Sequence, residues 1–285
     1  MKKDDLAEST QEQKLAKENC LLLMRTGSVL YGTDIPGKSD ADFQGVFMPP
    51  ESCFLGLKNM EQVSFSTNSS GAGKRNTVDD VDCCLYALPK FIQLLLNNNP
   101  NTLETLFVPE NCQLFSSVLG KRLYDNRDLF VSKKAYFSFK GYSDAQLKRL
   151  ERGEENGGGR QDLIQKYGYD TKMASHVMRL FYEANELLST GNITLPLKQN
   201  GVVLTVKRGE WNKERFIHEA NRAKEECAEI FANCKLRDTP DYEGANELLV
   251  SMVKDYYGFG SAKQSYSFKK WIAGILRSTA SYLEG

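Results

Sequence analysis

A run of alternating polar and apolar residues over 41–47 constrains the fold more than any other feature of this chain. Alternation with a period of two is typical of a strand with one buried face, and the prolines at 49 and 50 end it. Asp40 and Asp42 are two positions apart, so both carboxylates are expected on one face, roughly 6.5–7 Å apart along the strand. Two carboxylates at this spacing suit a pair of hard divalent cations.

A second strand-like run, residues 81–86, is expected to supply a third carboxylate from a neighbouring strand. Asp82 opens this run and is the best candidate. Asp80 has the same strand parity and remains an alternative, whereas Asp79 has the opposite parity. Three carboxylates on two adjacent strands would complete a two-cation site able to neutralise a triphosphate.

A glycine turn precedes the paired aspartates by about a dozen residues. At Gly27 the backbone N–H groups can approach phosphate oxygens closely, and the Ser28 hydroxyl adds a donor. Each of these short patterns is common by itself on protein surfaces. The combination of Gly-Ser, Asp-x-Asp on a strand and a later strand led by Asp82 is much more specific.

These motifs resemble the DNA polymerase β-like nucleotidyltransferase superfamily, and most closely its predicted RNA-repair members associated with RNA ligases. The resemblance covers about residues 20–255. It is carried by Gly27-Ser28-x-x-Tyr31-Gly32-Thr33, Ser39-Asp40-Ala41-Asp42-x-x-Gly45-Val46, Asp82-x-x-x-Tyr86-x-Leu88-x-Lys90-Phe91, Asn99-Pro100-Asn101-x-Leu103-Glu104-x-Leu106, Gly168-Tyr169-Asp170-Thr171-Lys172-x-Ala174-x-His176 and Val206-Lys207-Arg208-Gly209-Glu210. Pro89 stands where an Arg is common in the family.

The resemblance implies an α/β (α+β) nucleotidyltransferase domain with a small mixed sheet, followed by a mainly helical domain that closes over the nucleotide. It implies that Asp40 and Asp42 bind two Mg²⁺ ions, with Mn²⁺ as a substitute, and that Asp82 is the third, metal-binding and base-like carboxylate. Together with basic residues of the later segments, the expected nucleotide-binding residues are Gly27, Ser28, Tyr31, Ser39, Lys90, Lys172, His176, Arg179, Lys207 and Arg208.

The expected helix over 171–189 has an apolar face and a polar stripe beside it. The stripe contains Lys172, His176, Arg179 and Glu183 at spacings of four, three and four. It is interpreted as a basic wall for a triphosphate or a nucleic-acid backbone, with a solvated face and an Arg–Glu pair as the alternative. The apolar face consists of Met173, Val177, Leu180, Phe181, Ala184 and Leu188.

Other charges have two interpretations as well. Lys207 and Arg208 follow a strand-like run over 202–206 and are expected to reach phosphates from a loop, with ordinary loop charge as the alternative. Lys90 is expected to face the triphosphate or to lie on the surface. Glu104 would orient a ribose or a basic side chain, or cap a helix.

Composition limits the possible partners. Lys and Arg total 37 and so do Asp and Glu, which excludes a strongly basic nucleic-acid binder and requires local charge for any polyanion. No apolar run is long enough to span a membrane, and the polar start lacks the apolar core of a secretory signal. Seven cysteines without a CxxC pair and only two histidines argue against a zinc centre and for the reducing cytoplasm.

The expected organisation has four parts: a polar arm or helix over 1–19, a catalytic domain over 20–120, a helical substrate- and nucleotide-closing domain over 121–255 and an extension over 256–285. The catalytic domain is expected to begin with helical residues 16–26 and to contain a loose stretch over 57–79. Further helices are expected at 89–96, 136–152, 213–232, 242–257 and 269–283.

The predicted function is Mg²⁺-dependent transfer of an NMP from an NTP to an acceptor hydroxyl, with release of pyrophosphate. The favoured acceptor is an RNA 3′ end, either of tRNA or of a repaired RNA. The alternatives are nucleotidylation of a protein or a small molecule, a non-catalytic nucleotide- or RNA-binding module, and a structural protein with incidental acidic residues. The sequence does not indicate an oligomeric state.

Overall fold

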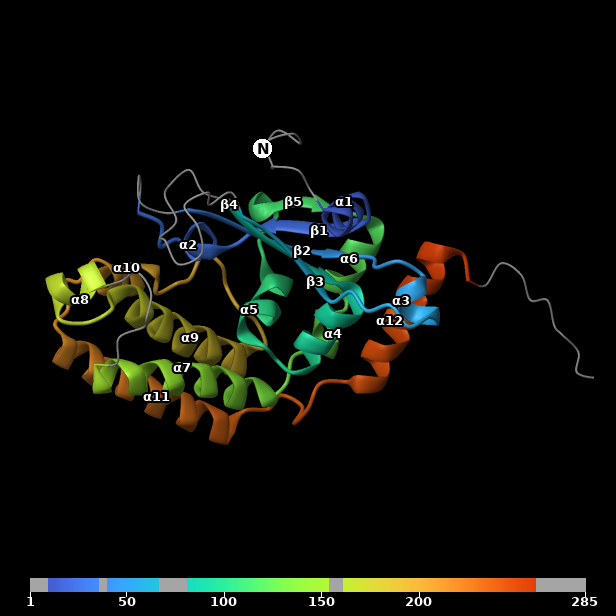
Figure 1. Ribbon diagram of the computed structural model, residues 1–285. Helices are drawn as coiled ribbons and strands as arrows, with labels where there is room; N and C mark the ends of the chain where they lie inside the picture. Colours follow the sequence, from blue (N-terminus) through green and yellow to red (C-terminus); the bar gives the residue numbers. More distant parts are fainter. Residues whose placement is uncertain (1–9, 36–39, 67–80, 154–160, 260–285) are drawn as a thin grey trace, which may run out of the picture. The chain divides into compact units, whose positions relative to one another are not determined.

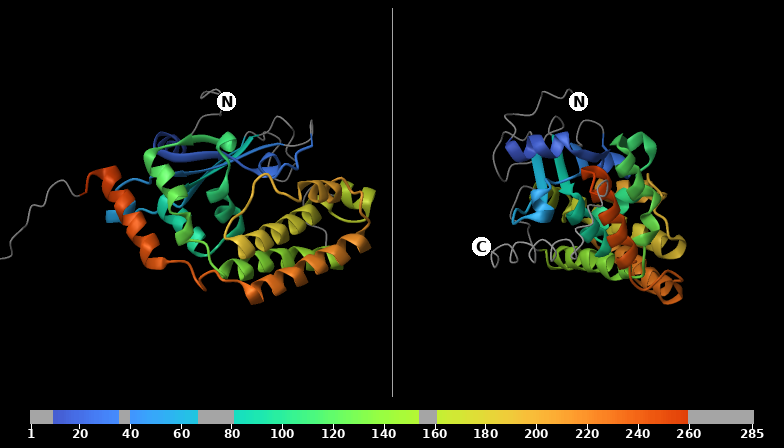
Figure 2. Two further views of the ribbon diagram at one scale, coloured as in Figure 1. Left: turned by 180° about the vertical axis from the view of Figure 1, so that it is seen from behind. Right: turned by 90° about the vertical axis from the view of Figure 1, so that its right-hand side faces the viewer.

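The computed structural model describes residues 10–35, 40–66, 81–153 and 161–259 (Figures 1 and 2). Within these ranges a five-stranded sheet has the strand order β3-β4-β2-β1-β5. The strands are β1 (Cys20–Arg25), β2 (Ala41–Phe47), β3 (Gln62–Ser66), β4 (Val81–Ala87) and β5 (Gln113–Ser116). Strands β2 and β4 are parallel and the other neighbours are antiparallel, which confirms the predicted small mixed sheet.

Helices flank the sheet and dominate the second half of the chain (Figure 1). Those around the sheet are α1 (Gln11–Glu18), α2 (Gly27–Leu30), α3 (Ser52–Leu55), α4 (Leu88–Leu96), α5 (Pro100–Leu103) and α6 (Val118–Asp125), with the 3-10 turns η1 (Glu104–Phe107), η2 (Glu110–Cys112) and η3 (Arg127–Leu129). The later ones are α7 (Lys134–Arg152), α8 (Gln161–Tyr167), α9 (Thr171–Thr190), α10 (Asn200–Lys207), α11 (Lys213–Asn233) and α12 (Tyr242–Tyr257).

Strand β3 alternates between buried and exposed residues, and one face of the sheet carries an apolar cluster. On β3, Val63 and Phe65 are buried, and they join Phe47, Leu85 and Ala16 of helix α1 in one apolar cluster. The alternate residues of the same strands project from the opposite face, as period-two geometry requires. That opposite face is polar where β2 and β4 begin, and the candidate site is located there.

Helices α7, α9 and α11 pack against one another below the sheet in Figure 1. Every residue of the predicted apolar face of α9 is buried: Met173, Val177, Leu180, Phe181, Ala184 and Leu188. The helix is capped at both ends: Asp170 Oδ1 accepts from Met173 N at 2.9 Å, and Gly191 is in the left-handed region at φ 73°. The predicted helix over 171–189 is therefore confirmed.

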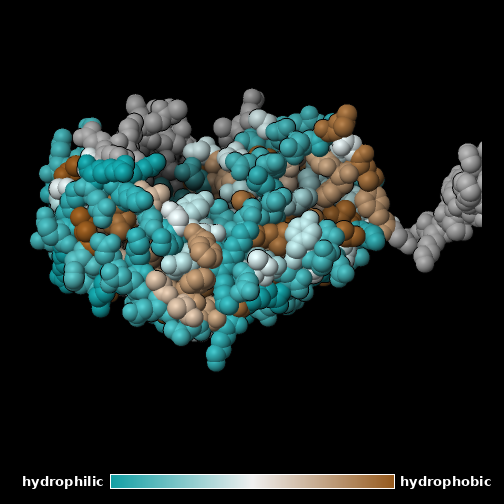
Figure 3. Space-filling model, turned by 90° about the horizontal axis from the view of Figure 1, so that it is seen from below, coloured by the Kyte–Doolittle hydropathy of each residue, from teal (hydrophilic) through white to brown (hydrophobic). Residues whose placement is uncertain are grey.

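The surface seen from below is mainly hydrophilic, and its apolar residues form separate patches (Figure 3).

Aromatic rings connect helices α7 and α11. Tyr136 of α7 stacks on Phe231 of α11 with 4.2 Å between ring centroids, and Phe137 contacts the same ring edge-on. Because these rings pack on each other, they stabilise the contact between α7 and α11.

Three local predictions were wrong. The expected strand over 202–206 is helix α10, in which the β-branched Val203 and Val206 are buried three positions apart on one helical face. Most of the expected helix over 16–26 is strand β1, which lies between β2 and β5 and is apolar over consecutive residues. The expected loose stretch contains β3, and its residues from 67 onward lie outside the described ranges.

Among the described residues, those up to Leu249 form one compact unit and those from Val250 onward belong to a second one. The predicted domain boundaries after residues 19, 120 and 255 stay predictions, and the helix expected over 269–283 lies outside the described residues. In the part of the chain that the structure describes, no helix is both long and apolar enough to cross a membrane.

Candidate active site

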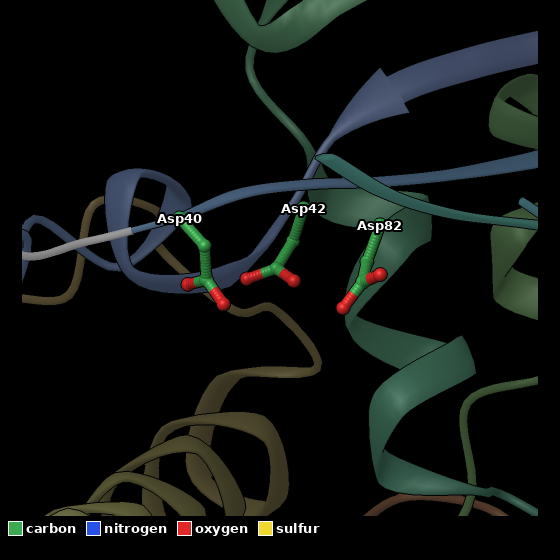
Figure 4. A group of neighbouring side chains, drawn as sticks. All are labelled: Asp40, Asp42 and Asp82. Carbon is green, nitrogen blue, oxygen red and sulfur yellow. The ribbon is translucent and has the colours of Figure 1, made fainter. Parts of the chain in front are cut away.

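Three carboxylates gather where β2 and β4 begin. Asp42 and Asp82 are paired directly across the parallel strands, and Asp40 immediately precedes β2. One oxygen of each carboxylate lies within 4.8 Å of the other two, and all three groups are partly buried. The three side chains point to the same side of the sheet (Figure 4). Parallel pairing in register therefore brings together residues that are 40 positions apart in the chain.

The glycine turn is built directly against this cluster. Thr26 N donates to Asp42 O at 2.9 Å, which joins the start of α2 to β2. Gly27 has φ 69°, and a Cβ at this position would overlap Asp42 Oδ2. Glycine is thus required both by the backbone angle and by the space that the carboxylate occupies. The carbonyl of Ser28 accepts from Thr33 N at 2.8 Å and closes the turn.

The carboxylates repel one another. Burial raises the pKa of Asp42, and the charges of Asp40 and Asp82 raise it further, while Lys172 and Lys207 act in the opposite direction. Partly buried oxygen donors with unbalanced negative charge are the donor set that hard divalent cations prefer. The residues present therefore fit a site for a hard divalent cation.

Two predicted cationic residues lie near the cluster. Burial lowers the pKa of Lys207, and Lys172 lowers it too, against the opposing charges of Asp40 and Asp42. The ammonium group of Lys207 donates to Thr33 O at 2.8 Å, which ties helix α10 to the segment after α2. Lys172, at the start of α9, is exposed. The fold thus brings two lysines from different helices toward the carboxylates.

A cavity of about 460 Å³ opens beside Asp42 and Asp82. Its other lining residues are Thr26, Gly27 and Tyr31; Phe43 and Gln44; Ser64, Phe65 and Ser66; Cys83 and Cys84; and Asn101 and Glu104. The volume lies in the range of roughly 300–1,000 Å³ that is typical of small-molecule sites. Ser64 and Ser66 were missed because β3 was not predicted, and Gln44 was missed because its one signal is strand parity with Asp42.

Arg179, which was predicted to bind the nucleotide, is buried and paired with carboxylates of the protein itself. It is 4% exposed, and its guanidinium donates to Glu104 and to Glu183 Oε1, the latter at 3.0 Å. Its other terminal nitrogen lies 2.9 Å from His176 Nδ1. The Arg–Glu pair of the alternative interpretation is present, but it is buried rather than solvated. Glu104 is therefore a partner for a basic side chain, one of the roles expected for it.

The remaining predicted residues are dispersed. Lys90 forms an ion pair with Glu61 Oε2 at 2.6 Å and follows the far end of β4, about 16 Å along the strand from Asp82. Arg208 is exposed at the end of α10, and Tyr31 lines the cavity. Ser39 lies outside the described residues, as does the alternative carboxylate Asp80.

The mixed sheet, the paired aspartates and the helical region after them define a polymerase β-like nucleotidyltransferase fold. The particular family follows from a match to a family model described as the RNA repair pathway DNA polymerase beta family (RlaP), which covers residues 1–247. The chain belongs to this family.

Two individual proteins are also similar to this chain, but each similarity is weaker or shorter than the match to the family model. A segment of 117 residues is 34% identical to an uncharacterized 38.9 kDa protein in the nrdC-mobD intergenic region of Enterobacteria phage T4, and it covers 40% of this chain and 34% of that protein. The match thus spans about a third of the length of that relative. A nucleotidyltransferase-like protein from Exiguobacterium sibiricum aligns over 85% of this chain and 76% of its own, with 12% identity and a TM-score of 0.29. That similarity is too low for a comparison of the two sites.

Proposed function

We propose that the protein is a Mg²⁺-dependent nucleotidyltransferase, which transfers an NMP from an NTP to an acceptor hydroxyl and releases pyrophosphate. The observation that carries the proposal is the pairing of Asp42 with Asp82 beside Asp40, with carboxylate oxygens within 4.8 Å of one another. Family membership supports the reaction class. The seven cysteines are unpaired, which supports a reducing compartment, the cytoplasm.

Each part of the site has a role in the proposed reaction. Two divalent cations held by Asp40, Asp42 and Asp82 would supply charge neutralisation at the triphosphate and at the attacking oxygen. Lys172 and Lys207 hold the triphosphate from the helical side. The Ser28 hydroxyl and the backbone N–H groups of its turn donate hydrogen bonds to phosphate oxygens.

Asp82 is the base in the proposed chemical step. The acceptor hydroxyl gives its proton to a carboxylate oxygen of Asp82, and the acceptor oxygen forms a bond to the α-phosphorus. The bond from that phosphorus to the bridging oxygen of the leaving group breaks, and pyrophosphate departs. Positioning and charge neutralisation supply most of the rate, since phosphoryl transfer needs little covalent chemistry from the protein.

The proposed acceptor is an RNA 3′ end, of tRNA or of a repaired RNA, and the description of the family supports it. The balanced charge of 37 against 37 implies that RNA is held locally, near its end, and that binding weakens with salt. A small hydroxylated molecule is a second candidate, because Gln44, Ser64 and Ser66 give the cavity an uncharged, hydrogen-bonding wall.

The test is transfer from labelled NTPs with Mg²⁺ or Mn²⁺ to tRNA, other RNA, protein, small hydroxylated compounds or no added acceptor. Labelled product is expected with RNA, and it should disappear in Asp40→Asn and Asp42→Asn. If no combination yields product that depends on these aspartates, the proposed reaction is wrong. Nucleotide binding that is unchanged by removal of Mg²⁺, without turnover, would indicate a binding module.

A further inference from the structure

A buried polar network joins helix α9 to the wall of the cavity. Arg179 donates to Glu104 and to Glu183, and the Tyr31 hydroxyl donates to Glu104 Oε1 at 2.6 Å. The guanidinium carbon lies 4.0 Å from the centre of the Tyr31 ring, in cation–π geometry. Arg179 thus contacts Glu104 and also the ring of Tyr31, whose hydroxyl donates to the same carboxylate.

This network contributes more to geometry than to stability. The side chains of Arg179, Glu104 and Glu183 are 5%, 2% and 0% exposed, so all three ionisable groups are removed from water. Two carboxylates share one guanidinium, and no donor among the described residues reaches Glu183 Oε2. Apolar side chains of similar volume often stabilise a fold at least as well as such a cluster. What they cannot provide is a fixed set of hydrogen-bond directions.

The network ends at the candidate active site. Tyr31 and Glu104 line the cavity together with Asp42 and Asp82. Asn101, another lining residue, accepts from Arg179 Nη2 at 3.4 Å. The N–H of Tyr31 donates to Gly27 O at 3.4 Å, so the position of the tyrosine is also connected to the turn that contacts Asp42.

We propose that Arg179 is a positioning residue for the nucleotidyl transfer: by fixing Glu104 and Tyr31 it sets the cavity wall and the Gly27 turn relative to the carboxylates. This role rests on the proposed function. The planar guanidinium donates in several fixed directions at once and also covers the tyrosine ring, whereas an ammonium group is a point charge without that geometry. Retaining the charge as lysine is therefore not sufficient.

The test compares Arg179→Lys and Glu104→Gln with Arg222→Lys, which alters an exposed Arg–Glu pair on α11. Because a small displacement of a reacting group can reduce the rate a hundredfold, we expect kcat to fall about tenfold or more in the first two variants. KM for NTP should change by less than about threefold, since the triphosphate contacts remain. Arg222→Lys should match the wild type in both constants.

Two further measurements separate positioning from a structural role. If Arg179 acts through Tyr31, combining Arg179→Lys with Tyr31→Phe should reduce kcat by less than the product of the single effects. Without turnover, ATP and Mn²⁺ should raise the melting temperature of Arg179→Lys as much as that of the wild type. If Arg179→Lys does not fold, Glu104→Gln provides the same comparison.

A wild-type kcat in Arg179→Lys, with only a lower melting temperature, would overturn the positioning role and leave the proposed function intact. Independent effects of Arg179→Lys and Tyr31→Phe on kcat would overturn it as well. By contrast, a wild-type protein that binds no nucleotide with metal and transfers none would overturn the proposed function itself, and this role with it.

Discussion

Gly27 packs against the side chain of Asp42, so that a Cβ on the glycine would lie 2.9 Å from both Cβ and Cγ of the aspartate. The two residues are 15 positions apart, at the turn and on the strand. Their contact explains why the Gly-Ser and Asp-x-Asp patterns occur together in this chain. The turn can lie over the carboxylates only if its first residue has no side chain.

We expect Gly27→Ala to abolish transfer and to destabilise the fold. Gly153→Ala is the matched control, because Gly153 follows α7 at φ 66° and a methyl group there would meet no heavy atom of the described residues within 4 Å. Both substitutions carry the backbone cost of roughly 1–2 kcal/mol for a left-handed residue. Gly27→Ala adds the clash with Asp42, so chemical denaturation should show the larger loss of unfolding free energy there. Normal activity in Gly27→Ala would contradict this.

Asp42→Asn should stabilise the metal-free protein while it removes activity. Burial and the charges of Asp40 and Asp82 disfavour the ionised Asp42, so a neutral isostere relieves the repulsion. We expect the melting temperature at neutral pH to rise by roughly 2–4 °C without divalent cations. Asp144→Asn is the control of opposite sign, since hydrogen bonds from Lys140 and Lys224 outweigh burial and lower the pKa of Asp144. Its melting temperature should fall.

The increase in melting temperature that we expect for Asp42→Asn should depend on pH. The folded-state pKa of Asp42 is raised, so its destabilising effect is absent below the ordinary value of 3.8 and complete above the raised folded value. The difference in melting temperature between the variant and the wild type should therefore increase from about pH 4.5 to about pH 7.5. Scanning calorimetry at both values, without metal, measures it. A difference that shrinks as the pH rises would count against the repulsion.

Lys207→Met should weaken NTP binding more than it slows chemistry. The ammonium group lies near the carboxylates and is partly buried, so its charge is screened less than that of a surface lysine. We expect KM for NTP to rise about tenfold, with a smaller change in kcat. Lys121→Met, which removes an exposed pair with Asp125 on α6, should leave KM unchanged. Equal KM values in both variants would contradict a triphosphate contact at Lys207.

The strands that carry the site could be predicted because their patterns are local. Alternation over 41–47 and the position of Asp82 at the start of its strand place the carboxylates on one face without knowledge of the fold. Strand β1 could not be recognised in this way, because a central strand is apolar at consecutive positions and resembles a buried helix. Helix α10 was missed because burial of Val203 and Val206 overrides the strand preference of β-branched residues.

The role of Arg179 could not be derived from spacing. The residues at 172, 176, 179 and 183 follow the helical period, but they differ in burial: Lys172 is exposed and Glu183 is fully buried. Which of them is buried depends on Glu104 and Tyr31, which are 75 and more residues away. A helical period describes one helix and contains no information about the segments that pack on it.

Because β2 and β4 pair in register, the distance between Asp42 and Asp82 does not depend on how many residues connect the two strands. The distance from Asp42 to Asp82 is set by the main-chain ladder, which any sequence with the right alternation can form. The number of residues between the two strands therefore does not set the distance between the aspartates, provided that β3 keeps its own pairing with β4. Substitutions at Ser64 and Ser66, which β3 contributes to the cavity, can therefore alter which acceptor fits without moving the two aspartates.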